Sequence, residues 1–179
     1  MDPSPQVVQE SNIGPSYSVA AFKYFESNLQ AGYYLTTPSA ADGSNIIMEY
    51  INPSSPNNQK WFLKNISFPK IAIVSRSTVG SKQFALDGGA MTAGTQLQLS
   101  EFNSSSPKPS QQWILNGNCL QLVNNNLVMD VAGGNPTAGT PVILSMIKNP
   151  PLKSQQFTLR DTQAVEVTEC NGSAALCSE

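Results

Sequence analysis

The sequence contains no histidine in its 179 residues. Catalytic triads of the Ser-His-Asp and Cys-His kinds, imidazole general bases and histidine metal sites are therefore excluded. Carboxylates remain as candidate acids and bases, but the pair Glu166 and Glu169 lies close to the end of the chain, and nothing places a second acid opposite it. We therefore predict that the protein is not an enzyme and that it carries no metal or other cofactor.

Charged side chains are also scarce, at 12% of the residues, and the formal net charge is −2. A balance this close to neutral offers no basic footprint for nucleic acid and no polybasic patch for an anionic membrane. The chain has no run of about 18 apolar residues, and residues 1–14 contain neither a basic stretch nor an apolar one. We predict a cytoplasmic protein without a signal peptide or membrane insertion, released from the cell, if at all, by a non-classical route.

Cysteine is the third scarce residue type. Cys119, Cys170 and Cys177 are too few and too late in the chain to build a disulfide framework. Free thiols in a reducing compartment are the expectation, and a bridge between Cys170 and Cys177 is the alternative. Hydrophobic residues make up 40% of the sequence, so one domain of this length can bury its own core without such bridges.

One pattern recurs three times along the chain. The clearest anchor is Gln-x-aromatic, at 59–61, 111–113 and 155–157. A second anchor, glycine followed by alternating apolar residues, lies 18 or 19 residues before each aromatic, at 43–48, 94–99 and 139–144. A third precedes it as Leu86-Asp87 and Met129-Asp130, with Leu35-Thr36 in the first copy. Three anchors in the same order and at nearly equal spacing indicate a threefold internal repeat.

Short segments rich in Val, Ile, Leu, Tyr and Phe lie between clusters of Gly, Pro, Asn and Ser, which is typical of strands and turns. The predicted strands are 71–75, 84–87, 97–102 and 113–115 in the middle copy and 120–123, 127–131, 142–147 and 157–159 in the last. Three four-stranded units are too few for a propeller, which has roughly four to eight blades, and favour an all-β barrel closed with threefold symmetry. About nine extra residues precede Asp87 in the middle copy, and we predict that they form a surface loop.

The recurring Gln-x-Trp motif, which becomes Gln-x-Phe in the last copy, follows the Leu-Asp and Gly-Thr anchors. With this pattern the sequence resembles the ricin-B-type (R-type) lectins, especially intracellular fungal members. The resemblance implies a β-trefoil of three four-stranded repeats with pseudo-threefold symmetry. Its strands would divide between a short barrel and a cap of hairpins, with the Gln-x-Trp side chains in the core. It covers roughly residues 17–160, with repeats at about 17–65, 66–116 and 117–160, and leaves 1–16 as an N-terminal tail and 161–179 as a C-terminal extension.

The same resemblance implies a carbohydrate-binding lectin that recognises glycans in shallow sites on the outer faces of its repeats. In such a site the Asp of Leu-Asp accepts hydrogen bonds from sugar hydroxyls. An aromatic ring on the strand after Gly-Thr stacks on the sugar, and polar groups just before Gln-x-Trp complete the set. Carried over to this chain, the candidate residues are Asp87, Gln98, Phe102 and Ser110 in the middle copy, Asp130 in the last and Asn58 in the first. The middle copy is the first choice and the last copy is the second.

Each of these assignments has an ordinary structural alternative. Asp87 and Asp130 precede or approach glycines, where aspartate commonly forms an Asx turn. The usual aromatic position of the middle copy is Ser100, and Phe102 replaces it only because it has the same strand parity. Phe102 can equally pack under the loop at 103–110. The sequence leaves both alternatives open.

No copy has the complete set of sugar-binding residues, so we expect monosaccharide affinities that are roughly millimolar, about −4 kcal/mol per site. Useful binding would then need several sites acting together, within one chain or in a homodimer. The competing hypothesis is a β-trefoil protease inhibitor or other protein-binding module that has lost sugar binding. Its binding surface would be the Pro-rich loops at 52–58, 104–110 and 149–154.

Overall fold

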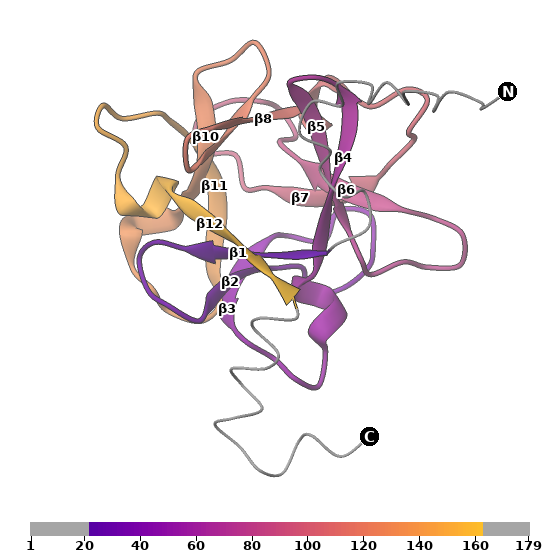
Figure 1. The fold of residues 1–179 in the computed structure, drawn as a ribbon, viewed down its shortest axis with the longest axis horizontal. Coiled ribbons are helices and arrows are strands. Elements are labelled where there is room, and N and C mark those ends of the chain that lie inside the picture. The colour runs from indigo at the N-terminus through magenta and orange to yellow at the C-terminus, as the bar shows by residue number, and fades with distance from the viewer. Residues whose placement is uncertain (1–21, 163–179) are drawn as a thin grey trace, which may run out of the picture.

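The structure is a computed structural model that describes residues 22–162. The predicted tail at 1–16 and most of the predicted extension at 161–179, with Cys170 and Cys177, lie outside these residues. Within them, no helix is long and apolar enough to cross a bilayer. Residues 22–162 form one sheet of 12 strands, which confirms the all-β prediction (Figure 1).

The strands match the predicted segments to within a few residues. They are β1 (Lys23–Ser27), β2 (Tyr33–Thr36), β3 (Ile47–Tyr50), β4 (Trp61–Ser67), β5 (Lys70–Ser75), β6 (Phe84–Asp87), β7 (Gln98–Glu101), β8 (Trp113–Asn116), β9 (Cys119–Leu122), β10 (Leu127–Val131), β11 (Thr140–Met146) and β12 (Phe157–Asp161). The short 3-10 helices are η1 (Pro56–Gln59), η2 (Pro109–Gln111), η3 (Ala132–Gly134) and η4 (Lys153–Gln155).

Half of the strands form the barrel. Strand β1 pairs with β12 and β4, β5 pairs with β4 and β8, and β8 pairs with β9. The ring closes where the amide of Phe157 donates to the carbonyl of Asn118 at 2.8 Å. The first and last strands therefore lie side by side, as β1 and β12 do near the centre of Figure 1.

The other strands form three hairpins, β2–β3, β6–β7 and β10–β11, which meet around a common axis. The amide of Ile46 donates to the carbonyl of Leu97 at 2.8 Å, and the amide of Leu97 donates to Val142 at 2.9 Å. The amide of Val142 donates back to Ile46 at 3.1 Å. A cycle of three hydrogen bonds between equivalent residues requires a threefold relation between the repeats, so the predicted pseudo-threefold β-trefoil is confirmed.

The three aromatic anchors converge in the core, as predicted. Trp61, Trp113 and Phe157 are at most 1% exposed and share one apolar cluster. The indole N–H of Trp61 donates to the Leu35 carbonyl at 3.0 Å, and that of Trp113 donates to Leu86 at 3.2 Å. Phenylalanine has no such donor, so the Phe157 side chain contributes apolar packing but no hydrogen bond to its hairpin.

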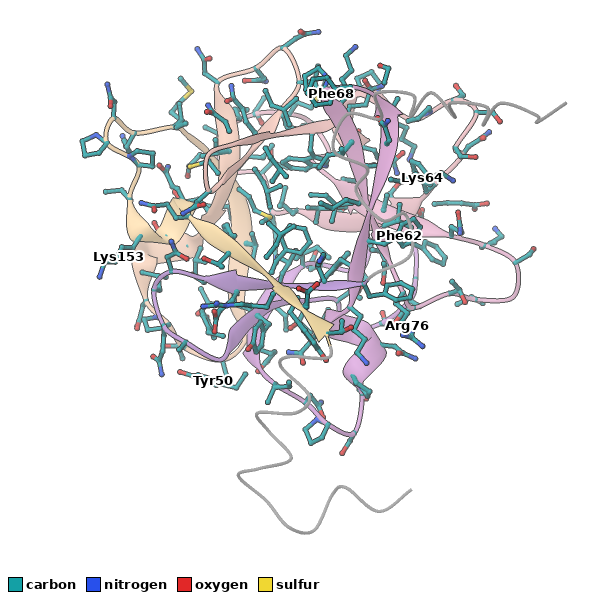
Figure 2. The ribbon with its side chains drawn as sticks, viewed as in Figure 1. Tyr50, Phe62, Lys64, Phe68, Arg76 and Lys153 are labelled. Carbon is teal, nitrogen blue, oxygen red and sulfur yellow. The ribbon has the colours of Figure 1, made fainter. Side chains whose placement is uncertain are left out.

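The predicted surface loop before Asp87 is only partly a loop. Strand pairing places Trp61 opposite Ser75 but Trp113 opposite Leu122, so much of the insertion lengthens the β4–β5 hairpin. The remainder lengthens the connection between β5 and β6. Pairing extends this far because apolar side chains on the outer side of the hairpin form a second cluster, which the sequence pattern did not reveal. Phe68 lies at the hairpin tip with 89% of its surface exposed (Figure 2).

Candidate functional site

The glutamine of each Gln-x-aromatic anchor is fully buried and holds the end of its repeat's outer hairpin. Its Nε2 donates to the carbonyl of the last residue in the hairpin's second strand, and its Oε1 accepts a backbone N–H from the loop that follows. The Nε2 distances are 3.0 Å from Gln59 to Tyr50, 3.1 Å from Gln111 to Glu101 and 3.0 Å from Gln155 to Met146. These amides therefore satisfy backbone groups where the chain turns.

In the last repeat the same glutamine also orients a candidate sugar-binding carboxylate. Asp130, on β10, is 9% exposed, and its Oδ2 accepts a hydrogen bond from Gln155 Nε2 at 3.1 Å. No described residue donates to Oδ1 of Asp130, so this oxygen keeps its capacity to accept a hydrogen bond.

Burial raises the pKa of the neighbouring Cys119 thiol, and the charge of Asp130 raises it further. The thiol is therefore protonated at neutral pH.

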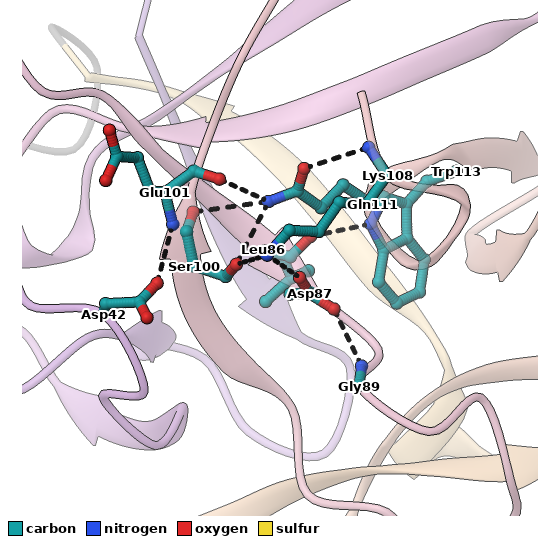
Figure 3. A network of polar contacts seen from close by, with 9 residues as sticks. All are labelled: Asp42, Leu86, Asp87, Gly89, Ser100, Glu101, Lys108, Gln111 and Trp113. Atoms are coloured by element: carbon teal, nitrogen blue, oxygen red, sulfur yellow. Dashed lines mark hydrogen bonds and ion pairs between the residues drawn. The ribbon is translucent and has the colours of Figure 1, made fainter. Parts of the chain in front are cut away.

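In the middle repeat both oxygens of the equivalent carboxylate have partners within the protein (Figure 3). Oδ1 of Asp87 accepts the backbone N–H of Gly89 at 2.8 Å, which is the Asx turn considered as an alternative. Oδ2 lies 3.7 Å from the ammonium group of Lys108, which also donates to Ser100 Oγ at 2.5 Å. A lysine thus lies in front of the carboxylate where a sugar hydroxyl would donate.

Lys108 was not among the site residues predicted from the sequence. The signal was present: Ser100 is small at the usual aromatic position, and a long basic side chain stands just before Ser110. A serine there leaves room for the lysine, and Asp87 attracts it. The Lys108 side chain is 56% exposed, so its ion pair with Asp87 contributes only about 0.2–1 kcal/mol to stability. A ligand can therefore displace the lysine from the carboxylate.

The remaining candidates of the middle repeat divide into two groups. Gln98 lies opposite Asp87 in the β6–β7 register, and the carbonyl of Ser110 accepts the N–H of Gly88 at 2.8 Å, so Asp87, Gln98 and Ser110 are brought together. The amide of Gln98 donates to Asn45 of the first repeat at 3.2 Å. Phe102, in contrast, is 7% exposed and packs in the outer apolar cluster, with Lys64 over its ring. Its ring is not placed to stack on a sugar.

In the first repeat no carboxylate stands at the position of Asp130. Thr36 replaces it, and its Oγ1 accepts from Gln59 Nε2 at 3.0 Å. Asn58 is half-buried, and its Oδ1 accepts from the hydroxyl of Ser77 at 2.9 Å. Asn58 also lines an open polar depression of about 410 Å³, together with Arg76 of the next repeat. Five of the six candidate residues therefore lie in three separate places, one per repeat, and Phe102 lies apart from them in the outer apolar cluster.

Metal binding has no support in the part of the chain that the structure describes, because no three Cys, Asp or Glu side chains gather there closely enough to hold an ion.

Residues 24–157 match the model of the ricin-type β-trefoil lectin domain. No curated protein matches this chain.

Several solved structures share the fold at low sequence identity. The C-half of the earthworm R-type lectin, in complex with GalNAc, has 22% identity and a TM-score of 0.64, and the match covers 79% of this chain and 99% of that one. The Macrolepiota procera ricin B-like lectin, in complex with lactose, has 22% identity and a TM-score of 0.56, with 79% and 96% covered. ThreeFoil, a designed threefold-symmetric protein, has 22% identity and a TM-score of 0.63, with 78% and 98% covered.

Proposed function

The chain belongs to the family of ricin-type β-trefoil lectin domains, and from this premise we propose that it is a carbohydrate-binding lectin without catalytic activity. We place its main site on the outer face of the third repeat, at Asp130. The observation that carries this choice is the different use of the two carboxylates. Gln155 orients Asp130 and leaves one oxygen open, whereas Gly89 and Lys108 engage both oxygens of Asp87.

The surroundings of Asp130 support a weak sugar site. A carboxylate that accepts from sugar hydroxyls forms charge-assisted hydrogen bonds of about 1.5–3 kcal/mol each. Ile143 lies directly opposite Asp130 in the β10–β11 register and is half-buried, so it offers apolar contact to the C–H side of a ring. Ser145, two residues on, offers a hydroxyl. Without an aromatic platform, roughly millimolar affinity for a monosaccharide is expected.

The middle repeat is proposed as a second, weaker site that Lys108 partly closes. Replacing Lys108 with methionine keeps the length of the side chain but removes the ammonium group from in front of Asp87. We expect the affinity of this repeat for a neutral sugar to rise by a few-fold at most, because the exposed ion pair contributes only about 0.2–1 kcal/mol. Calorimetric titration would measure this as a change in affinity and in the number of sugars bound per chain.

Lys70→Met is the matched control for this substitution, since Lys70 begins β5 at the tip of the β4–β5 hairpin and belongs to neither proposed sugar site. It should leave the binding of neutral sugar unchanged. If Lys108→Met instead weakened binding, the lysine would be a sugar contact and not an obstacle.

A screen of the full chain against an immobilised glycan library, run beside a panel of protease inhibition assays, tests the proposed function. We expect binding to a subset of glycans and no inhibition. Inhibition without glycan binding would favour the protein-binding alternative, in which the Pro-rich loops form the contact surface.

Because single sites are weak, we also propose that binding in a biological setting uses several sites, within one chain or in a homodimer. Sedimentation would detect the homodimer.

A further inference from the structure

Two polar depressions lie where one repeat meets the next, and neither is lined by Asp87 or Asp130. In each, a backbone N–H just after the first strand of a repeat donates to the carbonyl of the middle residue of the Gln-x-aromatic anchor in the adjoining repeat. The pairs are Asn28 to Gln156 at 2.9 Å, Arg76 to Lys60 at 2.8 Å and, at the third junction, Val123 to Gln112 at 3.0 Å. The β1–η4 depression, about 380 Å³ in volume, lies at the first of these junctions, and the Arg76 depression lies at the second.

The β1–η4 depression contains a guanidinium group fixed by a buried carboxylate. Glu26 is 7% exposed, and its Oε1 accepts the backbone N–H of Gly32 at 2.8 Å. Its Oε2 accepts from Nε of Arg160 at 2.6 Å. No described residue accepts from the two Nη groups of Arg160, whose side chain is 53% exposed and lines the depression. Their paired N–H donors match the geometry of a carboxylate or sulfate.

A second cation and a rigid polar wall complete the depression. Lys153, at the start of η4, is exposed and lines the same hollow, and no acid in residues 22–162 pairs with it. Asn28 accepts from the hydroxyl of Thr158 at 2.8 Å and donates to Gln156 Oε1 at 3.4 Å, so two amide side chains are held in place. Two cations therefore share the hollow with one carboxylate, Glu26, whose oxygens are already bonded.

The Arg76 depression is less suited to an anion. Arg76 is its one lining cation among the described residues, and the guanidinium lies over the ring of Phe22, 4.6 Å from the ring centre. Among residues 22–162 no buried carboxylate pairs with this guanidinium. Lys153 and Arg76 lie on opposite sides of the molecule in Figure 2, so the two depressions are separate surfaces.

We propose that the β1–η4 depression binds a carboxylate-bearing sugar unit, with the carboxylate on Arg160 and Lys153 and the sugar hydroxyls on Asn28, Gln30 and Gln156. This rests on the proposed lectin function but uses residues other than Asp130 and its partner Gln155. The volume suits a sugar better than a bare anion, and the amide side chains can donate to and accept from hydroxyls. The protein would thereby prefer acidic glycans over their neutral counterparts.

Methyl glucuronide and methyl glucoside form a matched pair of probes, because they differ only in the carboxylate. We expect the full chain to bind the glucuronide about tenfold or more tightly, and the side-chain amide NMR signals of Asn28 and Gln156 to shift. Raising the salt concentration should reduce the preference. Acetate is the probe for a bare anion, and it should shift these signals only at much higher concentration.

Arg160→Lys keeps the charge beside Glu26 but removes the paired donors, and it should lower glucuronide affinity about tenfold without a change in melting temperature. Lys153→Gln should lower it about two- to fivefold. Lys148→Gln removes one charge from the same loop region and should have no effect.

Two results would overturn the proposal: equal affinity for both probes, or acetate that binds as tightly as the glucuronide. Failure here is distinguishable from failure of the proposed lectin function. A neutral glycan that still binds and responds to substitution of Asp130 would leave the lectin proposal intact. Glucuronide binding that survives Asp130→Asn would support the depression independently.

Discussion

Replacing Trp113 with alanine is expected to lower the free energy of unfolding by about 3–5 kcal/mol. The side chain is fully buried in the common core, so its removal leaves a cavity lined by residues from more than one repeat. The variant also loses the hydrogen bond from the indole N–H to Leu86, which leaves a buried carbonyl without that partner. Urea unfolding followed by fluorescence and circular dichroism measures the change.

Trp113→Phe is the matched control, because the third repeat already has Phe157 at the equivalent position. Phenylalanine keeps most of the buried apolar surface and loses the indole N–H, so we expect a smaller loss of about 1–2 kcal/mol. Trp61→Phe should behave in the same way, since Trp61 makes the equivalent bond to Leu35. A loss below about 1 kcal/mol for Trp113→Ala would contradict the shared core.

Asp130→Asn is expected to reduce the affinity for a glycan that the protein binds by about 10- to 100-fold. The substitution keeps the size of the side chain and an oxygen that can accept from Gln155, but it removes the charge that strengthens hydrogen bonds from sugar hydroxyls. From a millimolar starting point, the remaining binding would be close to undetectable by calorimetry. The melting temperature should change little, because Gln155 keeps its bond to the Met146 carbonyl.

Asp87→Asn is the internal comparison for this result. Asp87 already accepts a hydrogen bond from Gly89 and pairs with Lys108. Its substitution should therefore weaken glycan binding less than the substitution of Asp130 does. Equal losses in the two variants would mean that ligands displace Lys108 freely and that both repeats bind. A larger loss at Asp87 would reverse the assignment and restore the middle repeat as the main site.

The repeat pattern of the sequence was enough to predict the fold. Three features repeat at nearly constant spacing: the aromatic of each anchor, the alternating apolar residues after each glycine, and the turn clusters between them. Because the three sequence units are alike, they fold into three similar structural units. The extended β4–β5 hairpin was not predicted, because its outer side packs on Phe102, far along the chain. Local pattern contains no information about such a contact.

The sequence predicted where the candidate carboxylates lie in their repeats, but not which groups in the protein bind them. Asp87 and Asp130 occupy the same place in their repeats, yet one is engaged by Lys108 and the other is oriented by Gln155. The difference comes from side chains that only tertiary packing brings together. The pairing of Glu26 with Arg160 is a stronger case, since closure of the barrel between β1 and β12 joins residues from opposite ends of the fold.

The most direct test of the account is an NMR titration of the full chain with a neutral glycan identified in the library screen. The side-chain amides of Gln59, Gln111 and Gln155 report separately on the three repeats, since each lies beside the candidate site of its own repeat. We predict that the Gln155 signal shifts first and furthest, followed by that of Gln111. A bound glycan that leaves the Gln155 signal unchanged would contradict the assignment of the main site to Asp130.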